Sequence, residues 1–502
     1  MDQLRWDAIC VGAGITSLAF GAQLVQRYPG VRLLIIDKHS VPGGYATMFR
    51  RPKVNAVFDC SLHKLSGMGQ HGNLYRILCD LGLDNELELH RSSDYFEANF
   101  PSRSFKLSND IEGFQADLYR EFPHEKIALE QFFSELAIHG RNGYYQFQMM
   151  DGSYEADFSQ LRYAHRHLKH ISVEQALNER FRDKDLCKLI AATGIYVGGF
   201  ANDLGYLYFL HVLYATLTQG NAYVKGSSQR LSDLLVSKIE RAGGKVLLNT
   251  NVHKVLSNTQ DQVQGVLTSK GEFHAPRVYI NASPHYALNV LFDEHPDLPQ
   301  VRSKLQKLAP SRSTTTLYLT TDQAPESLGF DSAESMLFTA DEEWEPVSQS
   351  DDSMEMLAEQ TYWRDSTLEV TNYHLLDAQG GPILCANVLD DIAHWPDRKS
   401  PLYKLKKARA QDALLQRLYA AKPDLHGHVN YLEVSTPRTY ERFTNNTDGA
   451  GYGAMVGTDL SGHVFHHGFP IAGVQFLSAW VAGPSYEAAF GYAEMKVNQW
   501  AA

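Results

Sequence analysis

The first fifty residues constrain the fold of this chain most strongly. An apolar run from Ala8 to Val11 leads into the turn Gly12-Ala13-Gly14, and a second apolar run, 31–36, ends at Asp37. Such runs are typical of buried parallel strands, and a glycine turn lets the backbone lie against a pyrophosphate at a helix N-terminus. The carboxylate can accept hydrogen bonds from a ribose diol. We therefore predict a dinucleotide-binding βαβ unit with a helix over 15–26.

The glycine fingerprint departs from its usual form at one position. Ser17 stands where a third glycine commonly allows a helix to pack closely on a strand. The strand, turn, helix, strand and acidic residue nevertheless follow in the expected order within about thirty residues. A dinucleotide fold is therefore favoured over an ordinary βαβ unit with a glycine-rich turn.

Composition limits the classes of protein open to the chain. Its 502 residues, 44% of them apolar, can form two or three lobes with separate cores. A net charge of −12 excludes a broad positive field for nucleic acid or anionic lipid. Five scattered cysteines show no metal or redox spacing and fit a reducing compartment. With no signal-peptide pattern at the start, we expect a cytoplasmic protein and leave peripheral membrane contact open.

The pattern of strands and helices indicates that the chain leaves its first lobe and returns to it. Short strands and glycine turns occupy 1–90, 220–310 and 436–502, which we assign to the dinucleotide-binding domain. Aromatic helices and alternating segments occupy 91–219 and 311–435, which we assign to a substrate-binding domain. The longest apolar stretch, within the first inserted segment, is shorter than the roughly 20 residues that span a bilayer, so we predict a buried helix there.

Short motifs with a characteristic order lie along nearly the whole chain. They are Gly12-Ala-Gly14, Asp37, Pro42-Gly43-Gly44, Phe58-Asp-Cys-Ser-Leu-His63, Gly226-Ser-Ser-Gln229, Asn249-Thr-Asn-Val252, the segment 436–442, Gly451-Tyr-Gly453 and the segment 469–480. In this order the chain resembles the FAD-dependent phytoene desaturase, carotenoid isomerase and retinol saturase family. The pattern ending at His63 leans towards the retinol saturase side. The resemblance implies an α/β fold: a Rossmann-like FAD-binding domain with an inserted α+β substrate domain, the two-lobed architecture of flavin oxidoreductases.

The resemblance also implies which residues bind FAD. The pyrophosphate is assigned to Gly12, Ala13, Gly14 and Ser17, the ribose to Asp37 with Lys38 beside it, and the adenine to the main chain at Val252. Gly43 and Gly44 let the chain pass close to the phosphates. Ser478, Ala479 and Ser485 are predicted to face the flavin, where a helix N-terminus can stabilise negative charge. Serine replaces a usual glycine at Ser227, and Gly483-Pro484-Ser485 stands where the family commonly has Pro-Gly-Gly.

Three residues are candidates for catalysis, although the cofactor itself supplies the hydride chemistry and a protein base is not obligatory. They are His63, in the family-like motif, and His211 and Glu487, near predicted tunnel or cofactor segments. Each also has a purely structural interpretation. No metal site is predicted.

A dense aromatic set in the first inserted segment bears on the substrate. It comprises Tyr196, Phe200, Tyr206, Tyr208, Phe209, Tyr214 and Tyr223. These side chains either line an apolar tunnel or fill the core of their own lobe. Together with the resemblance they favour a hydrophobic, polyene or isoprenoid-like substrate whose carbon–carbon bonds are desaturated, saturated or isomerised, with oxygen or a quinone as electron acceptor. The alternatives are a flavin amine or amino-acid oxidase and a non-catalytic flavin- or lipid-binding accessory protein.

Overall fold

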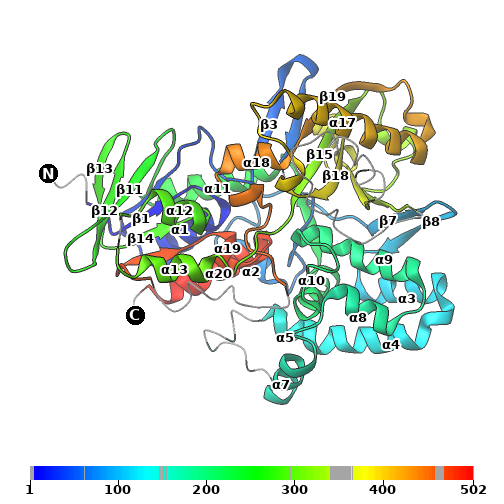
Figure 1. Ribbon diagram of the computed structural model, residues 1–502, viewed down its shortest axis with the longest axis horizontal. Helices are drawn as coiled ribbons and strands as arrows, with labels where there is room; N and C mark the ends of the chain where they lie inside the picture. The colour runs from blue at the N-terminus through cyan, green and yellow to red at the C-terminus, as the bar shows by residue number, and fades with distance from the viewer. Residues whose placement is uncertain are drawn as a thin grey trace.

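The computed structural model describes residues 5–60, 63–145, 149, 152, 155, 157–293, 295–339, 363, 366–457 and 469–500. Within these residues two lobes lie side by side (Figure 1). Residues 61 and 62 of the motif that ends at His63 lie outside the described part. No helix in that part is both long enough and apolar enough to cross a bilayer.

The first lobe is built on a five-stranded parallel sheet, at the left in Figure 1. Its strand order is β10 (Lys245–Leu247), β2 (Leu33–Ile36), β1 (Ala8–Val11), β14 (Val278–Ile280), β20 (Val474–Phe476), and every neighbouring pair is parallel. All residues of β1 and β2 are buried, as continuous apolar strands covered on both faces require. Three distant parts of the chain therefore complete one sheet.

Helices and smaller sheets surround this parallel sheet. Helix α1 (Ile15–Arg27) follows the glycine turn and packs against α11 (Ser228–Arg241) and α20 (Tyr486–Asn498). The other elements of this lobe and its border are α2 (Asn73–Asp80), α12 (Pro284–Val290), α13 (Leu298–Leu305), α18 (Pro437–Thr444), α19 (Ala479–Ala482), the hairpin β3 (Met48–Arg51)–β4 (Ala56–Asp59), the sheet β11 (Val252–Ser257)–β12 (Val263–Thr268)–β13 (Gly271–His274), and the sheet β5 (Leu65–Ser66)–β9 (Asn221–Val224)–β6 (Leu89–His90).

The second lobe contains a seven-stranded sheet. Its order is β19 (Val429–Ser435), β15 (Ser313–Thr321), β18 (Ile383–Asp390), β17 (Leu368–Asn372), β16 (Glu334–Leu337), β7 (Asp94–Phe100), β8 (Arg103–Ser108). Neighbours are antiparallel except β16 and β7, which are parallel. Helix α17 (Pro401–Ala421) lies beside the β15 end of the sheet (Figure 1).

A helical layer completes the second lobe. It consists of α3 (Ile111–Glu121), α4 (Lys126–Glu135), the π-helical turn η4 (Leu136–Gly140), α5 (Arg141–Tyr144), α7 (Phe158–His167), α8 (Val173–Arg180), α9 (Lys184–Ala192) and α10 (Tyr206–Thr218). Helix α10 is the buried helix predicted from the longest apolar stretch, since it packs into the core formed by the other helices. The segments predicted to form the dinucleotide-binding domain thus supply the parallel sheet, and those predicted to form the substrate-binding domain supply the seven-stranded sheet.

Two serines adopt backbone conformations that favour glycine. Ser227 has φ 77° and Ser485 has φ 112°. Both stand at positions where the resemblance leads one to expect glycine, so the chain keeps the glycine-like backbone despite a side chain. A non-glycine residue in this region stores strain on the order of 1–3 kcal/mol. Each of the two serines therefore lowers the stability of the folded protein locally.

The substitution Ser227→Gly is expected to stabilise the protein by about 1 kcal/mol. Glycine releases the backbone strain at this position, but it also raises the conformational entropy of the unfolded chain, which offsets part of the gain. The buried Ser227 hydroxyl has no hydrogen-bond partner among the described residues, so no bond is lost. Urea unfolding measures the gain. Ser227→Ala is the matched control, because it removes the hydroxyl but keeps the Cβ. Equal stability of the two variants would contradict the strain explanation.

Candidate functional site

A cavity of about 520 Å³ opens at the carboxyl ends of β1 and β2. This is where open parallel sheets bind dinucleotides. Nine of the twelve predicted cofactor residues line it: Gly12, Gly14, Asp37, Lys38, Gly43, Gly44, Val252, Ser478 and Ala479. They come from the three chain segments that meet in the parallel sheet. The structure therefore assembles one dinucleotide-sized cavity from parts of the chain that lie more than four hundred residues apart.

The main chain fixes the Asp37 carboxylate at the end of β2. The Ala13 amide donates to Oδ2 at 2.6 Å, and the His39 amide donates to Oδ1 at 2.8 Å. Asp37 is half-buried and lines the cavity, so its remaining lone pairs can accept hydrogen bonds from a ribose diol. Burial lowers the pKa of the neighbouring Lys38, and the Asp37 charge partly offsets this effect.

Two glycines allow backbone approaches that a side chain would block. A Cβ on Gly12, whose φ is 103°, would lie 2.3 Å from the Asn281 carbonyl oxygen. A Cβ on Gly43, whose φ is 117°, would lie 2.1 Å from the Ala46 carbonyl oxygen. The first contact joins the glycine turn to the end of β14, and the second closes the Gly43 loop on itself beside the cavity.

Two buried polar atoms at the cavity test whether a dinucleotide fits. Asn281 Nδ2 and Ser478 Oγ both belong to cavity-lining residues, and neither has a hydrogen-bond partner among the described residues. Buried donors without partners are costly unless a ligand or water satisfies them. Together with the glycine turn and Asp37, they fit a ligand that carries several acceptor oxygens, as a dinucleotide does.

Three predicted cofactor residues do not line this cavity. Ser17 is fully buried on α1 among core residues, so its side chain occupies the helix–strand interface. Ala13 is also fully buried, and its amide and carbonyl are taken up by Asp37 and Gly43. Ser485 lines a second cavity, where its Oγ accepts from the Ala488 amide and caps α20.

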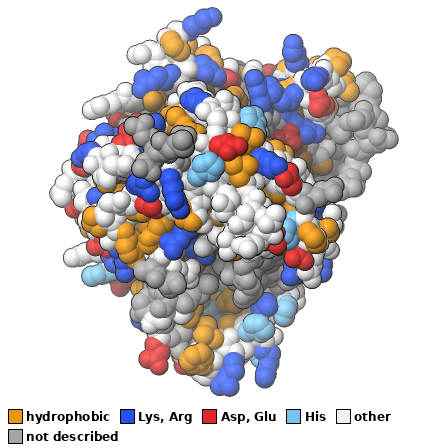
Figure 2. Space-filling view, turned by 90° about the vertical axis from the view of Figure 1, so that its left-hand side faces the viewer, with side chains coloured by type: hydrophobic (Ala, Val, Ile, Leu, Met, Phe, Trp, Pro, Cys, Tyr) orange, Lys and Arg blue, Asp and Glu red, His pale blue; other side chains and the backbone are white. Residues whose placement is uncertain are grey.

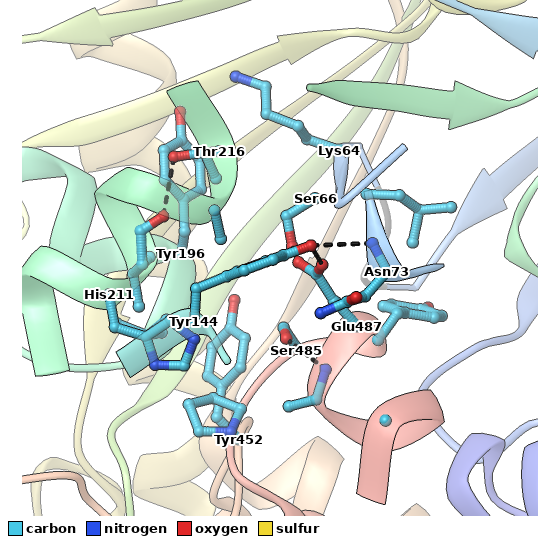
Figure 3. Close-up of a pocket in the computed structure, with 18 of the residues that line it drawn as sticks. Lys64, Ser66, Asn73, Tyr144, Tyr196, His211, Thr216, Tyr452, Ser485 and Glu487 are labelled. Atoms are coloured by element: carbon cyan, nitrogen blue, oxygen red, sulfur yellow. Dashed lines mark hydrogen bonds between the residues drawn. The ribbon is translucent and has the colours of Figure 1, made fainter. Parts of the chain in front are cut away.

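The second cavity, of about 110 Å³, brings together all three candidate catalytic residues, His63, His211 and Glu487. Figure 3 shows His211 and Glu487 in its wall. It lies between α10, α20 and the strand β5. Neighbouring parts of the chain line the two cavities: Gly451 and 478–480 line the first, whereas Tyr452 and 484–488 line the second, so the cavities lie close together. Five tyrosines also contribute to the wall, namely Tyr144, Tyr196, Tyr208, Tyr452 and Tyr486.

Glu487 in the first turn of α20 is held by two hydroxyl groups. Tyr144 donates to Oε1, and Ser66 donates to Oε2 at 2.8 Å, while the Asn73 amide donates to the Tyr144 oxygen at 2.9 Å (Figure 3). Burial raises the pKa of Glu487 to about 7, and the two hydroxyls partly offset the rise. No salt bridge joins it to a cation within the described residues. Glu487 can therefore hold or release a proton near neutral pH.

A charged network lies behind the wall of the same cavity: His63, Lys64 and Tyr196 line the cavity, and their common partner Glu334 does not. Glu334 on β16 accepts from Lys64 Nζ at 3.0 Å and from the Tyr196 hydroxyl at 2.7 Å, and it lies 3.0 Å from His63 Nδ1. Burial alone would raise the pKa of Glu334, but Lys64 and His63 outweigh it and bring the pKa to about 2. Burial opposes the charged form of His63, yet Glu334 raises its pKa. The pKa of Glu487, which lines the cavity, is thus raised, whereas the pKa of Glu334, behind the cavity wall, is lowered.

The network has the residue types of a metal site but is already satisfied as an ion-pair cluster. Ligand atoms of His63, Glu334 and Glu369 lie within 4.8 Å of one another. Both Glu334 oxygens are engaged by the contacts given above, and the Glu369 oxygens accept from Thr371 and Asn387. We therefore interpret the cluster as a structural and electrostatic wall of the cavity.

His211 on α10 stands in an apolar, aromatic part of the wall. Its ring lies 5.3 Å from that of Tyr208 and 6.3 Å from that of Tyr144, both edge-on. Burial lowers the pKa of His211 to about 4, so the imidazole is neutral at neutral pH. It can shape the cavity or accept a hydrogen bond, but it does not carry positive charge there.

Some residues of the predicted aromatic set line a cavity, and others fill the core of their own lobe. Tyr196 and Tyr208 line the second cavity. Tyr206 and Phe209 are fully buried in the helical core, where the Tyr206 hydroxyl donates to Glu135 at 2.7 Å. The partners Tyr144, Ser66, Lys64 and Glu334 were not foreseen, and no local pattern marks them. Spacing alone could not separate cavity residues from core residues.

The fold and the first cavity together define a two-lobed protein of the Rossmann-like dinucleotide-binding class. The family model described as "NAD(P)-binding Rossmann-like domain" matches residues 10–81. A solved oxidoreductase from Methanosarcina mazei superimposes with a TM-score of 0.66 over 97% of this chain and 99% of that chain. Identity is 15%, so this likeness concerns the fold, and it confirms the predicted fold class.

Sequence relatives extend over most of the chain. An all-trans-retinol 13,14-reductase of Danio rerio is 22% identical, over 90% of this chain and 78% of the relative. A chloroplastic prolycopene isomerase 1 of an Oncidium hybrid cultivar is 23% identical, over 90% of this chain and 76% of the relative. These similarities confirm the resemblance predicted from the motifs and agree with an oxidoreductase.

Proposed function

We propose that this protein is an FAD-dependent oxidoreductase that desaturates, saturates or isomerises carbon–carbon bonds of a hydrophobic, polyene or isoprenoid-like substrate. The observation that carries the proposal is the proximity of the two cavities, which neighbouring residues line: Gly451 lines the first and Tyr452 the second. One has the glycine turn, the Asp37 carboxylate and unsatisfied donors that suit a dinucleotide, and the other has an aromatic wall around Glu487. Relatives named as a retinol reductase and a prolycopene isomerase support a substrate with conjugated double bonds.

FAD supplies the hydride chemistry when it is bound, and the chain supplies the proton and the environment. When hydride adds to one carbon of a double bond, the other carbon must take a proton. Glu487, with a pKa of about 7, is the group in the second cavity suited to give that proton or take it back. Tyr144 and Ser66 orient its carboxyl group, and the surrounding tyrosines exclude water.

Anaerobic photoreduction followed by a substrate panel tests the proposal. The purified protein is expected to show flavin absorbance, and the reduced flavin is expected to reoxidise with polyenes but not with saturated analogues. Oxygen and a quinone are then compared as acceptors for the reverse, dehydrogenating direction. A colourless preparation that takes up no added FAD would overturn the proposal, and peroxide release with amines alone would favour an amine oxidase.

The substitution Asp37→Asn is expected to weaken FAD binding about tenfold or more, because charge-assisted hydrogen bonds to the ribose and to two backbone amides lose their carboxylate. Fluorescence titration of the apoprotein with FAD measures the loss. Asp7→Asn is the matched control, since Asp7 accepts from a backbone amide in the same lobe, that of Arg32, but does not line the cavity. If both variants bind FAD equally well, Asp37 does not contact the ribose.

A further inference from the structure

The polar side chains of the second cavity differ in whether the protein engages them. Ser66, Tyr144 and Tyr196 donate to glutamates, as described above. His211 and Tyr452 line the same cavity, but within the described part of the chain no hydrogen bond engages the His211 ring nitrogens or the Tyr452 hydroxyl. The cavity therefore has two polar side chains whose hydrogen-bonding capacity is left for a bound molecule.

An unpaired polar group has a different consequence in this cavity than on the outer surface. Figure 2 shows charged side chains of both signs scattered over the face of the first lobe, where bulk water satisfies them. The second cavity is small, and five tyrosines contribute to its wall. A polar group in such surroundings lowers stability unless water or a ligand pairs with it. The two side chains thus indicate where a polar atom of the substrate can be bound.

The second lobe holds the Tyr452 side chain in place. Gly198, whose φ is 71°, makes room for the ring, because a Cβ there would lie 2.4 Å from Tyr452 Cδ2. The Tyr452 amide donates to Ser311 Oγ at 3.0 Å. Burial raises the pKa of the Tyr452 hydroxyl, so this group keeps its proton and can donate a hydrogen bond at neutral pH.

The chain on either side of Tyr452 contacts the first cavity. Gly451 lines that cavity, and a Cβ on Gly453 would lie 2.6 Å from the carbonyl carbon of Ala479. Ala479 also lines the first cavity and is one of the residues predicted to face the flavin. Tyr452 therefore lies where the two cavities approach each other.

His211 offers a neutral donor from helix α10. One ring nitrogen of a neutral imidazole carries a hydrogen, so it can donate without bringing a full charge into the aromatic wall. A Cβ on Gly143 would lie 2.8 Å from the His211 Cβ, so α5 packs closely against α10 at this point. In Figure 3 His211 lies to the left of the cavity and Glu487 to its right. The imidazole and the carboxyl group thus approach a bound molecule from different sides.

We propose that the substrate carries a carbonyl group conjugated with the double bond that reacts, and that His211 and Tyr452 donate hydrogen bonds to the carbonyl oxygen. This inference rests on the proposed function and narrows its substrate class. A hydrocarbon has no such oxygen and leaves both polar groups unpaired.

The carbonyl gives the two donors a part in the reaction. When hydride from the reduced flavin adds to the far carbon of the double bond, the π electrons shift towards the carbonyl and leave a negative charge on its oxygen. His211 and Tyr452 stabilise this charge in a wall that holds little water. Glu487 then gives a proton to the carbon beside the carbonyl, which restores the carbon–oxygen double bond.

Two polyenes that differ in one group test the inference. One ends in a conjugated aldehyde, and the other is the hydrocarbon with a methyl group in its place. The FAD-loaded protein, reduced beforehand, is expected to turn over the aldehyde about 100-fold faster or more. Tyr452→Phe and His211→Phe are each expected to lower turnover of the aldehyde about 100-fold and to leave that of the hydrocarbon unchanged.

The carbonyl stretching frequency of the bound aldehyde provides a readout without turnover. The protein with oxidised flavin has no hydride to give, so the aldehyde binds without being reduced. Two hydrogen bonds to the oxygen are expected to lower the frequency, and each variant is expected to lose part of this shift. Tyr419→Phe is the matched control, because Tyr419 on α17 is half-buried but lines neither cavity, and it is expected to behave like the wild type.

Two kinds of failure can be told apart. Equal turnover of the aldehyde and the hydrocarbon, or a carbonyl frequency that neither cavity variant changes, would overturn the inference and leave the proposed function intact. If no polyene reoxidises the reduced flavin, the proposed function fails, and with it the reaction described for the carbonyl.

Discussion

The substitution Glu487→Gln is expected to lower turnover about 100- to 1,000-fold while FAD remains bound, which is the usual effect of removing a positioned acid or base. Glutamine keeps the shape of the side chain and can still meet Tyr144 and Ser66, but it cannot exchange a proton. With a pKa of about 7 in the wild type, the protonated form is lost as the pH rises through neutrality. A saturating reaction, which needs the acid, should slow over this range, and a desaturating reaction, which needs the base, should accelerate.

Two further variants separate proton transfer from packing. Tyr144→Phe keeps Glu487 but removes a hydroxyl that lowers its pKa, so the pH profile is expected to move to higher pH with a smaller loss of rate. Glu494→Gln, on the same helix but paired with Arg76 at the surface, is expected to leave turnover unchanged. A Glu487→Gln enzyme with normal turnover and the wild-type pH profile would exclude Glu487 as the proton carrier.

The pH dependence of the free energy of unfolding independently measures the effect of burying Glu487. The pKa of Glu487 is raised in the folded state, so the stability of the neutral form is fully present below the unfolded value of 4.5 and is lost as the pH rises through about 7. Relative to Glu487→Gln, the wild type should therefore lose about 3 kcal/mol between acid and alkaline conditions. We thus expect Glu487→Gln to lose activity and to be more stable than the wild type at alkaline pH. This combination is typical of a functional residue that destabilises the folded protein.

Spacing along the chain is most informative where a site is built from neighbouring residues of the sequence. The turn at Gly12, the strand ending at Asp37 and the loop at Gly43 lie within one βαβ unit, so their spacing determines their geometry. It was less successful for side-chain direction: Ser17 and Ser485 lie near the cofactor segments, yet one points into the core and the other caps α20. A motif locates the backbone, whereas the direction of each side chain depends on the helix that follows it.

The network around Glu334 could not have been predicted from the sequence. Glu334 meets Lys64 across 270 residues because β16 pairs in parallel with β7, and no local pattern specifies that pairing. His63 was singled out for its motif, but its partner and the direction of its pKa shift come from the second lobe. Residues that act together in the second cavity are thus assembled by tertiary packing between elements, not by spacing within one element.

The substitution Lys64→Met is expected to destabilise the protein by about 3–5 kcal/mol, because it leaves the buried Glu334 carboxylate without its main counter-charge. The two side chains are 7% and 3% exposed, and Lys64 Nζ also donates to the Tyr95 carbonyl at 2.7 Å. In the wild type the depressed pKa of Glu334 contributes stability above its unfolded value of 4.5, and this stability is lost as the pH falls towards about 2. Urea unfolding should therefore show the largest difference between wild type and variant near neutral pH and a smaller one in acid.

Three matched variants test this explanation. In Lys64→Met/Glu334→Gln no buried charge is left unpaired, so the double variant should be more stable than the sum of its single changes by at least about 1 kcal/mol. Lys64→Arg keeps the charge and should lose much less than Lys64→Met. Lys106→Met breaks a lysine–aspartate contact on the same sheet, but Lys106 is 41% exposed, so a loss of about 0–1 kcal/mol is expected. If Lys64→Met costs no more than Lys106→Met, the buried Glu334 is protonated in the folded protein, and its pKa is not lowered.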